Sequence, residues 1–355
     1  MSLTLYVDGT RLRDHVGAVA GRTPGFVPVA KGNGYGLTNR RLALEAQNLR
    51  ADTLALGTYD EIEHVARLFT GDLLVLTPFR PFGTAATFTP DRRLIHTVTR
   101  VEDIPPLLQI DPHARFVLER MTSLRTHGLS ARDMRAMVHA LAKHTGPDST
   151  EGPVLEGIAF DFPATEGGHL TELHRLMTDV VSSGLPTRTI WVGHLTEPEL
   201  IAARSIYPDV VIRPRLGAEL WLGDPTALRV RAHVLDLHRL ERGSTFGYRG
   251  RAVPRRGHLL VVSGGAAHGI GLEAPAGDLS LRSRATTLAR GSLDAAGLVR
   301  SPYVVDGKPR YFAEPPHAQA SLLYLPDEAE LPAIGDEVEV RARLTTMTFD
   351  QTVVS

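Results

Sequence analysis

A lysine at the end of a short apolar stretch has the setting that most clearly indicates chemistry in this chain. Lys31 follows Phe26–Ala30, which has the length and composition of a buried strand, and it precedes a loop dense in glycine. In α/β proteins the ends of the strands form the mouth in which reactive groups are placed. A lysine shielded from water there can lose its proton and form a Schiff base with a carbonyl compound. The alternative is an exposed lysine in a flexible turn.

The composition limits the classes of protein to which the chain can belong. Its 355 residues, 43% of them apolar, suit a barrel of ordinary size with a second module. A formal net charge of −1 argues against nucleic acid as a partner, and the lack of cysteine excludes disulfides, thiolate zinc sites and cysteine nucleophiles. No metal site is predicted. No run has the length of a signal-peptide core or a membrane span, so we expect a soluble cytoplasmic protein without a membrane partner.

Short apolar runs alternate with amphipathic stretches between residues 10 and 222, which predicts a (β/α)8 TIM-type barrel. The stretches Ala131–Ala142 and Thr171–Ser183 are typical of its helices. An open doubly wound sheet is the alternative, but the phosphate-loop patterns that would support it are absent. The expected strands are Phe26–Ala30, Thr53–Leu56, Leu73–Thr77, Leu94–His96, Ala114–Leu118, Gly157–Phe160, Thr189–Val192 and Val210–Ile212.

The sequence changes character after Trp221. Residues 223–355 have little helical periodicity, and apolar or alternating runs are separated by turn residues. This pattern predicts a C-terminal, mostly antiparallel β domain. Its expected strands include Arg229–Leu237, His258–Ser263, Ala318–Leu325 and Glu337–Ala342.

The string VAKGNGYG at residues 29–36 resembles the cofactor segment V-V-K-A-N-A-Y-G of the alanine racemase family, whose members are fold-type III enzymes. Residues 51–65 also look like the second strand and helix of that family. The resemblance implies that Lys31 holds pyridoxal 5'-phosphate as an internal aldimine and that Tyr35 reaches its phosphate. It also implies that residues 1–9 contribute a strand to the β domain, and that a homodimer forms in which this domain completes the partner's site.

A second segment, Arg213–Gly223, is similar to the family's R-x-G-I-A-x-Y-G stretch with one residue inserted. The resemblance implies that Arg215 donates to the pyridine nitrogen of the cofactor. Because an arginine cannot give up its proton, that nitrogen would stay unprotonated. The backbone N–H groups of Gly217 and Ala218 would then approach the phosphate, where glycine permits a close approach.

Three further alignments name binding residues. Thr196 falls near the family's phosphate-binding serine, although it also suits the N-cap of a helix beginning at Glu197. Arg125 aligns with an arginine that approaches the substrate carboxylate. In the β domain, a segment that meets the substrate carboxylate in the family aligns with residues 313–319, which makes Gln319 a candidate for substrate binding.

The chain departs from the family at its acid and base groups. The catalytic tyrosine that a partner's β domain supplies falls on Ala266, and the histidine that stacks on the cofactor ring falls on Asp161. The tyrosine that closes the phosphate site near the C-terminus has no clear counterpart. We predict that His268, two residues after the vacant position, replaces the first tyrosine, with His317 as the second candidate. For each, a structural histidine is the alternative.

These observations predict a pyridoxal-phosphate-dependent amino-acid racemase, or a related enzyme that moves a Cα proton. The substrate is expected to be an amino acid or a derivative, not necessarily alanine. Because the second base is altered, a protein that binds the cofactor without racemase catalysis is the main alternative. A sugar- or nucleotide-binding barrel, in which Lys31 only contacts an anion, is a third class.

Overall fold

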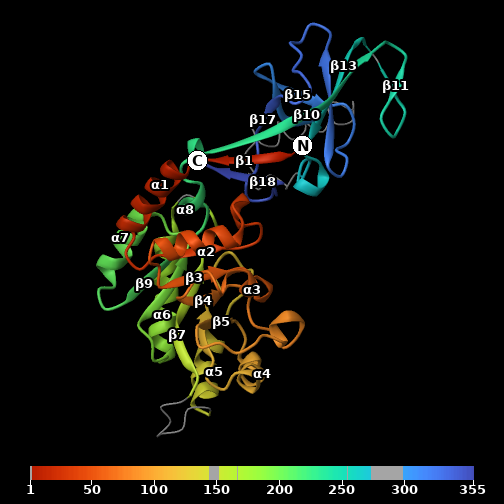
Figure 1. Cartoon of the computed structure of the whole chain (residues 1–355). Coiled ribbons are helices and arrows are strands. Elements are labelled where there is room, and N and C mark those ends of the chain that lie inside the picture. The colour runs from red at the N-terminus through yellow and green to blue at the C-terminus, as the bar shows by residue number, and fades with distance from the viewer. Residues whose placement is uncertain (1, 144–151, 166, 254, 273–298) are drawn as a thin grey trace. The chain divides into compact units, whose positions relative to one another are not determined.

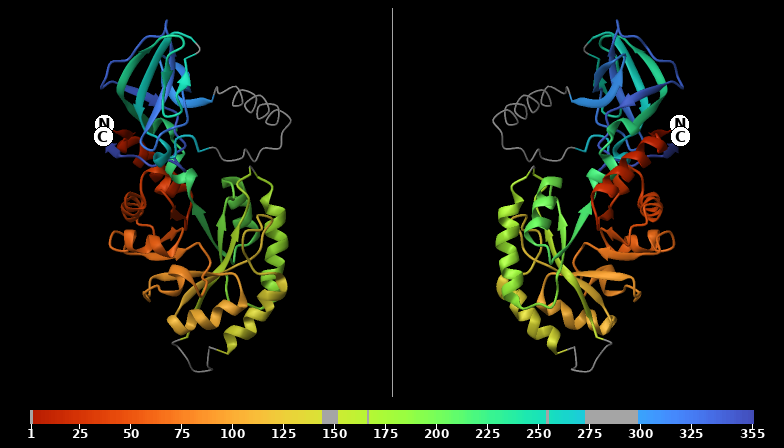
Figure 2. Two further views of the ribbon diagram at one scale, coloured as in Figure 1. Left: turned by 90° about the vertical axis from the view of Figure 1, so that its right-hand side faces the viewer. Right: turned by 90° about the vertical axis from the view of Figure 1, so that its left-hand side faces the viewer.

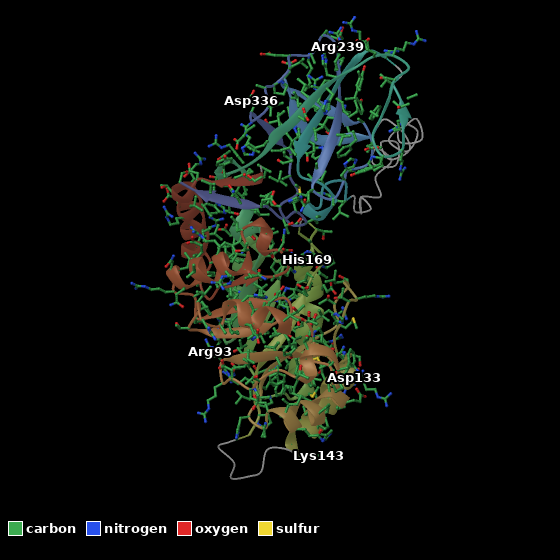
Figure 3. The ribbon with its side chains drawn as sticks, turned by 45° about the vertical axis from the view of Figure 1, so that its right-hand side comes forward. Arg93, Asp133, Lys143, His169, Arg239 and Asp336 are labelled. Atoms are coloured by element: carbon green, nitrogen blue, oxygen red, sulfur yellow. The ribbon has the colours of Figure 1, made fainter. Side chains whose placement is uncertain are left out.

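The chain folds into two compact units, shown in the computed structural model of Figure 1. Residues 14–223 form the barrel unit, and the N-terminal residues as far as Arg13 join residues 224–355 in the β unit. The structure describes residues 2–143, 152–165, 167–253, 255–272 and 299–355. In Figure 3, Arg93, Asp133 and His169 mark the barrel unit and Arg239 and Asp336 mark the β unit.

The barrel unit is built on eight parallel strands that close on themselves, which confirms the predicted (β/α)8 class. Neighbours pair in chain order, and the last strand pairs with the first through Val27 and Arg215. The last strand continues to Leu216, beyond the predicted end at Ile212, so Arg213 and Arg215 lie within it. The strands are β2 (Val27–Ala30), β3 (Thr53–Leu56), β4 (Asp72–Val75), β5 (Leu94–Val98), β6 (Arg115–Glu119), β7 (Val154–Asp161), β8 (Thr189–Gly193) and β9 (Val211–Leu216).

Helices cover the outside of these strands, as the views in Figure 2 show. Helix α2 begins after Thr38, whose side chain accepts a hydrogen bond from the backbone N–H of Arg41 at 3.4 Å. The helices described are α1 (Gly9–Arg22), α2 (Asn39–Asn48), α3 (Ile62–Val65), α4 (Ile104–Ile110), α5 (Ala131–Ala142), α6 (His169–Ser183), α7 (Glu197–Ile206) and α8 (Ala218–Leu222). Short 3-10 turns lie at Gly34–Gly36, Tyr59–Glu61, Gly83–Ala86, Val101–Asp103, Pro225–Ala227 and Ala266–His268.

The interior of the barrel is a packed apolar layer. Seven aliphatic side chains pack with the indole of Trp191. Strand β2 contributes two of them, and each strand from β3 to β7 contributes one. This layer excludes water from the barrel interior, so the polar groups at the strand ends lie on an apolar base. Its members are Val27, Val29, Ala55, Leu74, Ile95, Val117, Ala159 and Trp191.

The β unit is a largely antiparallel sheet, in agreement with the prediction from sequence. Strand β1 (Leu3–Val7) pairs antiparallel with β10 (Leu228–Leu240), and it pairs parallel with β18 (Gln351–Val354). The other strands are β11 (Thr245–Phe246), β12 (Arg251–Ala252), β13 (Gly257–Ser263), β14 (Arg300–Val305), β15 (Lys308–Phe312), β16 (Ala320–Pro326) and β17 (Glu337–Val340). Within the described residues of both units, no helix has the length and apolar character that a membrane crossing needs.

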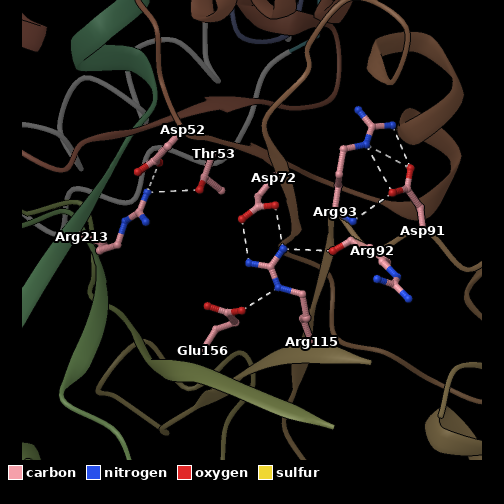
Figure 4. Close-up of polar contacts among 9 residues, drawn as sticks. All are labelled: Asp52, Thr53, Asp72, Asp91, Arg92, Arg93, Arg115, Glu156 and Arg213. Carbon is pink, nitrogen blue, oxygen red and sulfur yellow. Dashed lines mark hydrogen bonds and ion pairs between the residues drawn. The ribbon is translucent and has the colours of Figure 1, made fainter. Parts of the chain in front are cut away.

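Arg115 ties three barrel strands together, as Figure 4 shows. Its guanidinium donates two hydrogen bonds of 2.7 Å to Asp72 on β4 and one of 2.6 Å to Glu156 on β7. A fourth bond of 3.0 Å reaches the carbonyl of Arg92, just before β5. Because the arginine lies at the first residue of β6, the network joins neighbouring strands at the barrel end opposite the carboxyl ends of the strands.

Replacing Arg115 with Met is expected to lower the free energy of unfolding by about 1–3 kcal/mol, because two carboxylates lose a charged donor. Urea unfolding of the purified protein measures this change. Arg92→Met is the matched control: its side chain is exposed, its carbonyl remains, and its effect should stay within about 0.5 kcal/mol. Equal effects of the two substitutions would show that the network does not stabilise the barrel.

Candidate functional site

A cavity of about 360 Å³ opens where the barrel strands end. Its wall combines the residue after β2, the last residues of β6, β7 and β8, and a residue near the end of β9. Strand ends that are far apart in sequence meet here because the sheet is closed and all its strands run the same way. The lining residues are Val29, Lys31, Tyr35, Gly57, Leu76, Thr77, Glu119, Thr126, His127, Asp161, Gly193, His194, Arg215, Gly217 and Ala218.

Lys31 stands at the edge of this cavity in a tight turn. Its carbonyl accepts a hydrogen bond from the backbone N–H of Gly34 at 3.0 Å, and the next amide, that of Gly32, donates to Glu61 at 2.7 Å. A Cβ added to Gly57 would lie 2.9 Å from the Cβ of Lys31, so only glycine lets the chain pass so close. The sequence holds three lysines, and neither Lys143 nor Lys308 lines the cavity.

Tyr35, four residues after Lys31, places its hydroxyl on the wall of the same cavity. The residue adopts a left-handed backbone conformation (φ 54°) that turns its ring inward, and it is buried. A Cβ on Gly217 would lie 2.3 Å from this hydroxyl, so a glycine is required there. Burial, helped by the charge of Glu61, raises the pKa of Tyr35 to about 12, which keeps the hydroxyl a proton donor at neutral pH. No partner for this hydroxyl is found among the described residues.

Arg215 projects into the cavity from β9, and only one of its three guanidinium nitrogens is hydrogen-bonded within the described chain. One terminal nitrogen donates to the carbonyl of Phe160 at 3.0 Å and to the carboxylate of Asp161 at 3.3 Å. Its Nε–H is buried and has no partner in the part of the chain that the structure describes. A buried N–H without a partner costs free energy, so this atom calls for an acceptor from a ligand. Gly193 leaves room for the Asp161 carboxylate, because a Cβ on Gly193 would lie 2.2 Å from its Oδ1.

Two further titratable groups line the cavity. His194 has a left-handed backbone (φ 65°), and its Nε2 lies 3.9 Å from Asp161; burial lowers its pKa, although Asp161 opposes that shift. Glu119 is buried, and burial raises its pKa to about 7, with Arg215 opposing and Asp161 reinforcing the change. The sequence interpretation did not name either as a site residue. Both directly follow or nearly follow an expected strand, which is the signal that could have found them.

Two predicted binding residues of the barrel do not line the cavity. The hydroxyl of Thr196 donates to Glu199 at 2.9 Å, and the backbone N–H of Thr196 donates to the same carboxylate, so the residue caps α7. Arg125 is exposed, and the chain turns through a left-handed conformation there (φ 55°). As a result the following two residues, Thr126 and His127, face the cavity from this segment.

The remaining predicted residues belong to the β unit. His268 is buried with both ring nitrogens in hydrogen bonds: Nδ1 accepts from the backbone N–H of Gly265 at 3.2 Å, and Nε2 lies 3.0 Å from Asp350. An accepting Nδ1 places the ring proton on Nε2, which then donates to the carboxylate. This arrangement is that of a structural histidine, and proton transfer by His268 would require the bond to Asp350 to open.

His317 has a different setting in the same unit. Its Nε2 lies 2.5 Å from the buried carboxyl of Glu314, and its ring centroid lies 4.5 Å from that of Tyr248. Its second ring nitrogen therefore stays available for a contact. Gln319 has an exposed side chain, and its carbonyl accepts a hydrogen bond from Gly264 at 3.0 Å.

The comparisons with known proteins agree with this architecture. Residues 7–154 match the family model of the alanine racemase N-terminal domain, which confirms the resemblance drawn from the sequence. No curated protein sequence matches the chain. A solved alanine racemase from Bartonella henselae, with covalently bound pyridoxal phosphate, has a TM-score of 0.72 at 16% identity, and the match covers 100% of both chains.

Two other solved structures extend the comparison. An alanine racemase from D-cycloserine producing Streptomyces lavendulae gives a TM-score of 0.66 at 21% identity over 96% of this chain and 87% of that one. A histidine racemase from Leuconostoc mesenteroides gives 0.69 at 14% identity over 99% and 98%. At such identities the likeness establishes the fold alone, a (β/α)8 barrel followed by a β domain.

Gly193→Ala is expected to lower the free energy of unfolding by about 0.5–1.5 kcal/mol, the usual contribution of one hydrogen bond. The added methyl would displace Asp161 from its contact with Arg215. Gly17→Ala is the control: nothing lies within 4 Å of its Cβ in α1, so it should be neutral or stabilise by up to about 1 kcal/mol. Urea unfolding of both variants tests this, and a Gly193 variant as stable as the parent would contradict the tight packing described.

Proposed function

We propose that this chain binds pyridoxal 5'-phosphate at Lys31 and moves the Cα proton of an amino acid. The match of residues 7–154 to the alanine racemase N-terminal domain supports this proposal. One observation carries the proposal. An amine, a protonated phenol and a buried guanidinium N–H, two of them without a partner in the described chain, converge on one cavity. They are the donors that an aldehyde, a phosphate and a pyridine nitrogen require.

The residues present fit this cofactor. Lys31 is the one lysine of the cavity wall and supplies the amine for the aldehyde carbon. The Tyr35 hydroxyl and the backbone amides of Gly217 and Ala218 would bind the phosphate. The free Nε–H of Arg215 would donate to the ring nitrogen. Thr196, whose hydroxyl already bonds to Glu199, is left with the role of a cap.

Pyridoxal phosphate, when bound, supplies a conjugated system that stabilises negative charge at Cα. The chain determines how strongly it does so. Because the guanidinium of an arginine does not give up a proton in proteins, Arg215 would donate a hydrogen bond to the ring nitrogen without transferring a proton to it. Asp161, the last residue of β7, holds that guanidinium in place from the far side of β8. The amine of Lys31, at the cavity edge, would take or return a proton at Cα.

Several finer points belong to the same proposal. The substrate is an amino acid or a derivative, not necessarily alanine, and the protein acts in the cytoplasm as a homodimer. His268 and His317, acting from a partner's β unit, are candidates for a second proton-transfer group, and Gln319 and Arg125 are candidates for contacts of the substrate carboxylate. Because Ala266 cannot move a proton and His268 has both nitrogens engaged, cofactor binding without catalysis is the second candidate function.

The attachment of the cofactor tests the proposal directly. After incubation with pyridoxal phosphate and reduction with borohydride, we expect one pyridoxyl group on Lys31, located by peptide mass spectrometry. Lys31→Ala should lose this adduct and keep its circular dichroism spectrum, whereas Lys143→Ala and Lys308→Ala should retain it. A stoichiometric adduct on Lys143 or Lys308 in the parent would refute the proposed site.

Tyr35→Phe tests the phosphate subsite. Loss of a hydrogen bond to a charged group, about 1.5–3 kcal/mol, should raise the Kd for pyridoxal phosphate roughly 10–100-fold. Absorbance titration of the two proteins measures the change, with Tyr207→Phe, which removes a hydroxyl bonded to His174 between α6 and α7, as the control. An unchanged Kd for Tyr35→Phe would place the phosphate elsewhere.

A further inference from the structure

Glu119 occupies a position at the mouth of the barrel that the proposed function has not used. It is the last residue of β6, and β6 is separated from β2 by the same number of strands in either direction around the closed barrel. Lys31 follows β2 directly. The two side chains therefore start from opposite points of the mouth, and both line the cavity between them.

The carboxyl of Glu119 is buried and uncommitted. Only 7% of the residue is exposed, and the described chain offers its carboxyl no hydrogen bond or ion pair. The other acids around the mouth are used: Asp161 accepts from Arg215, and Glu61 accepts from the amides of Gly32 and Gly57 at 2.7 Å. The carboxyl oxygens of Glu119 are not among the fully enclosed atoms of the described chain, so they open onto the cavity, where a ligand can contact them.

The same surroundings determine how the group holds its proton. Arg215 is already shared between Asp161 and the carbonyl of Phe160, so it only partly offsets the cost of ionising Glu119. Burial dominates and raises the pKa of Glu119 to about 7. A group that is half protonated near neutral pH can both give and take a proton, which is the condition for efficient general acid–base catalysis.

We propose that Glu119 is the second proton-transfer group of the site and acts across the cavity from Lys31. The inference rests on the proposed function. In one direction the amine of Lys31 takes the Cα proton, and the carboxylic acid of Glu119 gives its proton to the other face of Cα. The electron pair of the broken C–H bond forms the new C–H bond, so no oxidant or reductant is needed. In the reverse direction the two groups exchange roles, and no residue of the β unit has to move a proton.

The proton on Glu119 can be observed without turnover. In the cofactor-free protein, infrared difference spectroscopy should show the carbonyl stretch of a protonated carboxylic acid that disappears as the pH rises through about 7. Glu119→Gln should lack this band, and Glu63→Gln, which changes an exposed acid on α3, should keep it. Retention of the band in Glu119→Gln would overturn the assignment.

Exchange in deuterium oxide tests the catalytic role. The parent should convert each enantiomer of a reactive amino acid into the other with incorporation of solvent deuterium. Glu119→Gln should slow inversion about 10²–10⁴-fold, bind pyridoxal phosphate as the parent does, and still exchange the Cα proton of one enantiomer through Lys31. Glu63→Gln should leave inversion unchanged.

Two results would overturn the inference, and they are distinguishable. If the parent racemises and Glu119→Gln inverts the amino acid at the same rate, the assignment to Glu119 fails while the proposed function stands. His268→Gln, tested beside it, should then lose inversion, because that histidine would carry the proton. If the parent binds the cofactor at Lys31 and exchanges no Cα proton of any amino acid, racemisation and the role of Glu119 fail together.

Discussion

The guanidinium of Arg215 is the group around which the polar residues of the cavity are arranged. It is the one arginine among the described cavity-lining residues, and two carboxyls, those of Asp161 and Glu119, lie within its field. Asp161 takes a hydrogen bond from it, Glu119 does not, and the Nε–H is left over. The unequal interaction of Arg215 with the two acids thus explains why Asp161 is held in a hydrogen bond and why Glu119 can be protonated. It also leaves the Nε–H of Arg215 without a partner in the described chain.

Closure of the barrel is what makes this arrangement possible. Lys31 and Arg215 lie far apart in the chain, yet β2 and β9 pair through Val27 and Arg215. Trp221 reinforces the same junction, because its indole N–H donates to the carbonyl of Val29 at 2.8 Å and holds α8 against β2. Gly217 then meets Tyr35 at a distance that no side chain would tolerate. The apolar layer around Trp191 keeps water out from below, so charges above it interact strongly.

The fold class can be predicted from the sequence because the periodicity of apolar residues and the spacing of the strands are local signals. The closed barrel confirms the predicted class. The sequence predicts Lys31 from its place at a strand end, and Tyr35 and Arg215 from the resemblance of their segments to those of the family, and all three line one cavity. Arg125 lies at a left-handed turn that no local sequence pattern predicts, and His127 of the same segment lines the cavity.

Other features of the site depend on tertiary contacts and could not be read from the chain. The hydroxyl of Thr196 is taken by Glu199, and the ring of His268 is held by Asp350, a residue 82 positions away in sequence. The raised pKa of Glu119 arises from burial and from the negative charge of Asp161, which together outweigh the charge of Arg215. A strand-end glutamate is ordinary in sequence, and only its lack of a partner in the described fold distinguishes it.

The measurement that tests this account most directly is the protonation state of the cofactor's ring nitrogen. Pyridoxal phosphate labelled with ¹⁵N in the ring, bound to the protein, should give the nitrogen NMR signal of an unprotonated, hydrogen-bonded pyridine, unchanged across the neutral pH range, because Arg215 donates without giving up its proton. In Arg215→Glu the signal should move to that of a protonated ring. A protonated ring nitrogen in the parent, or a signal that ignores the substitution, would contradict the placement of Arg215 and the site built around it.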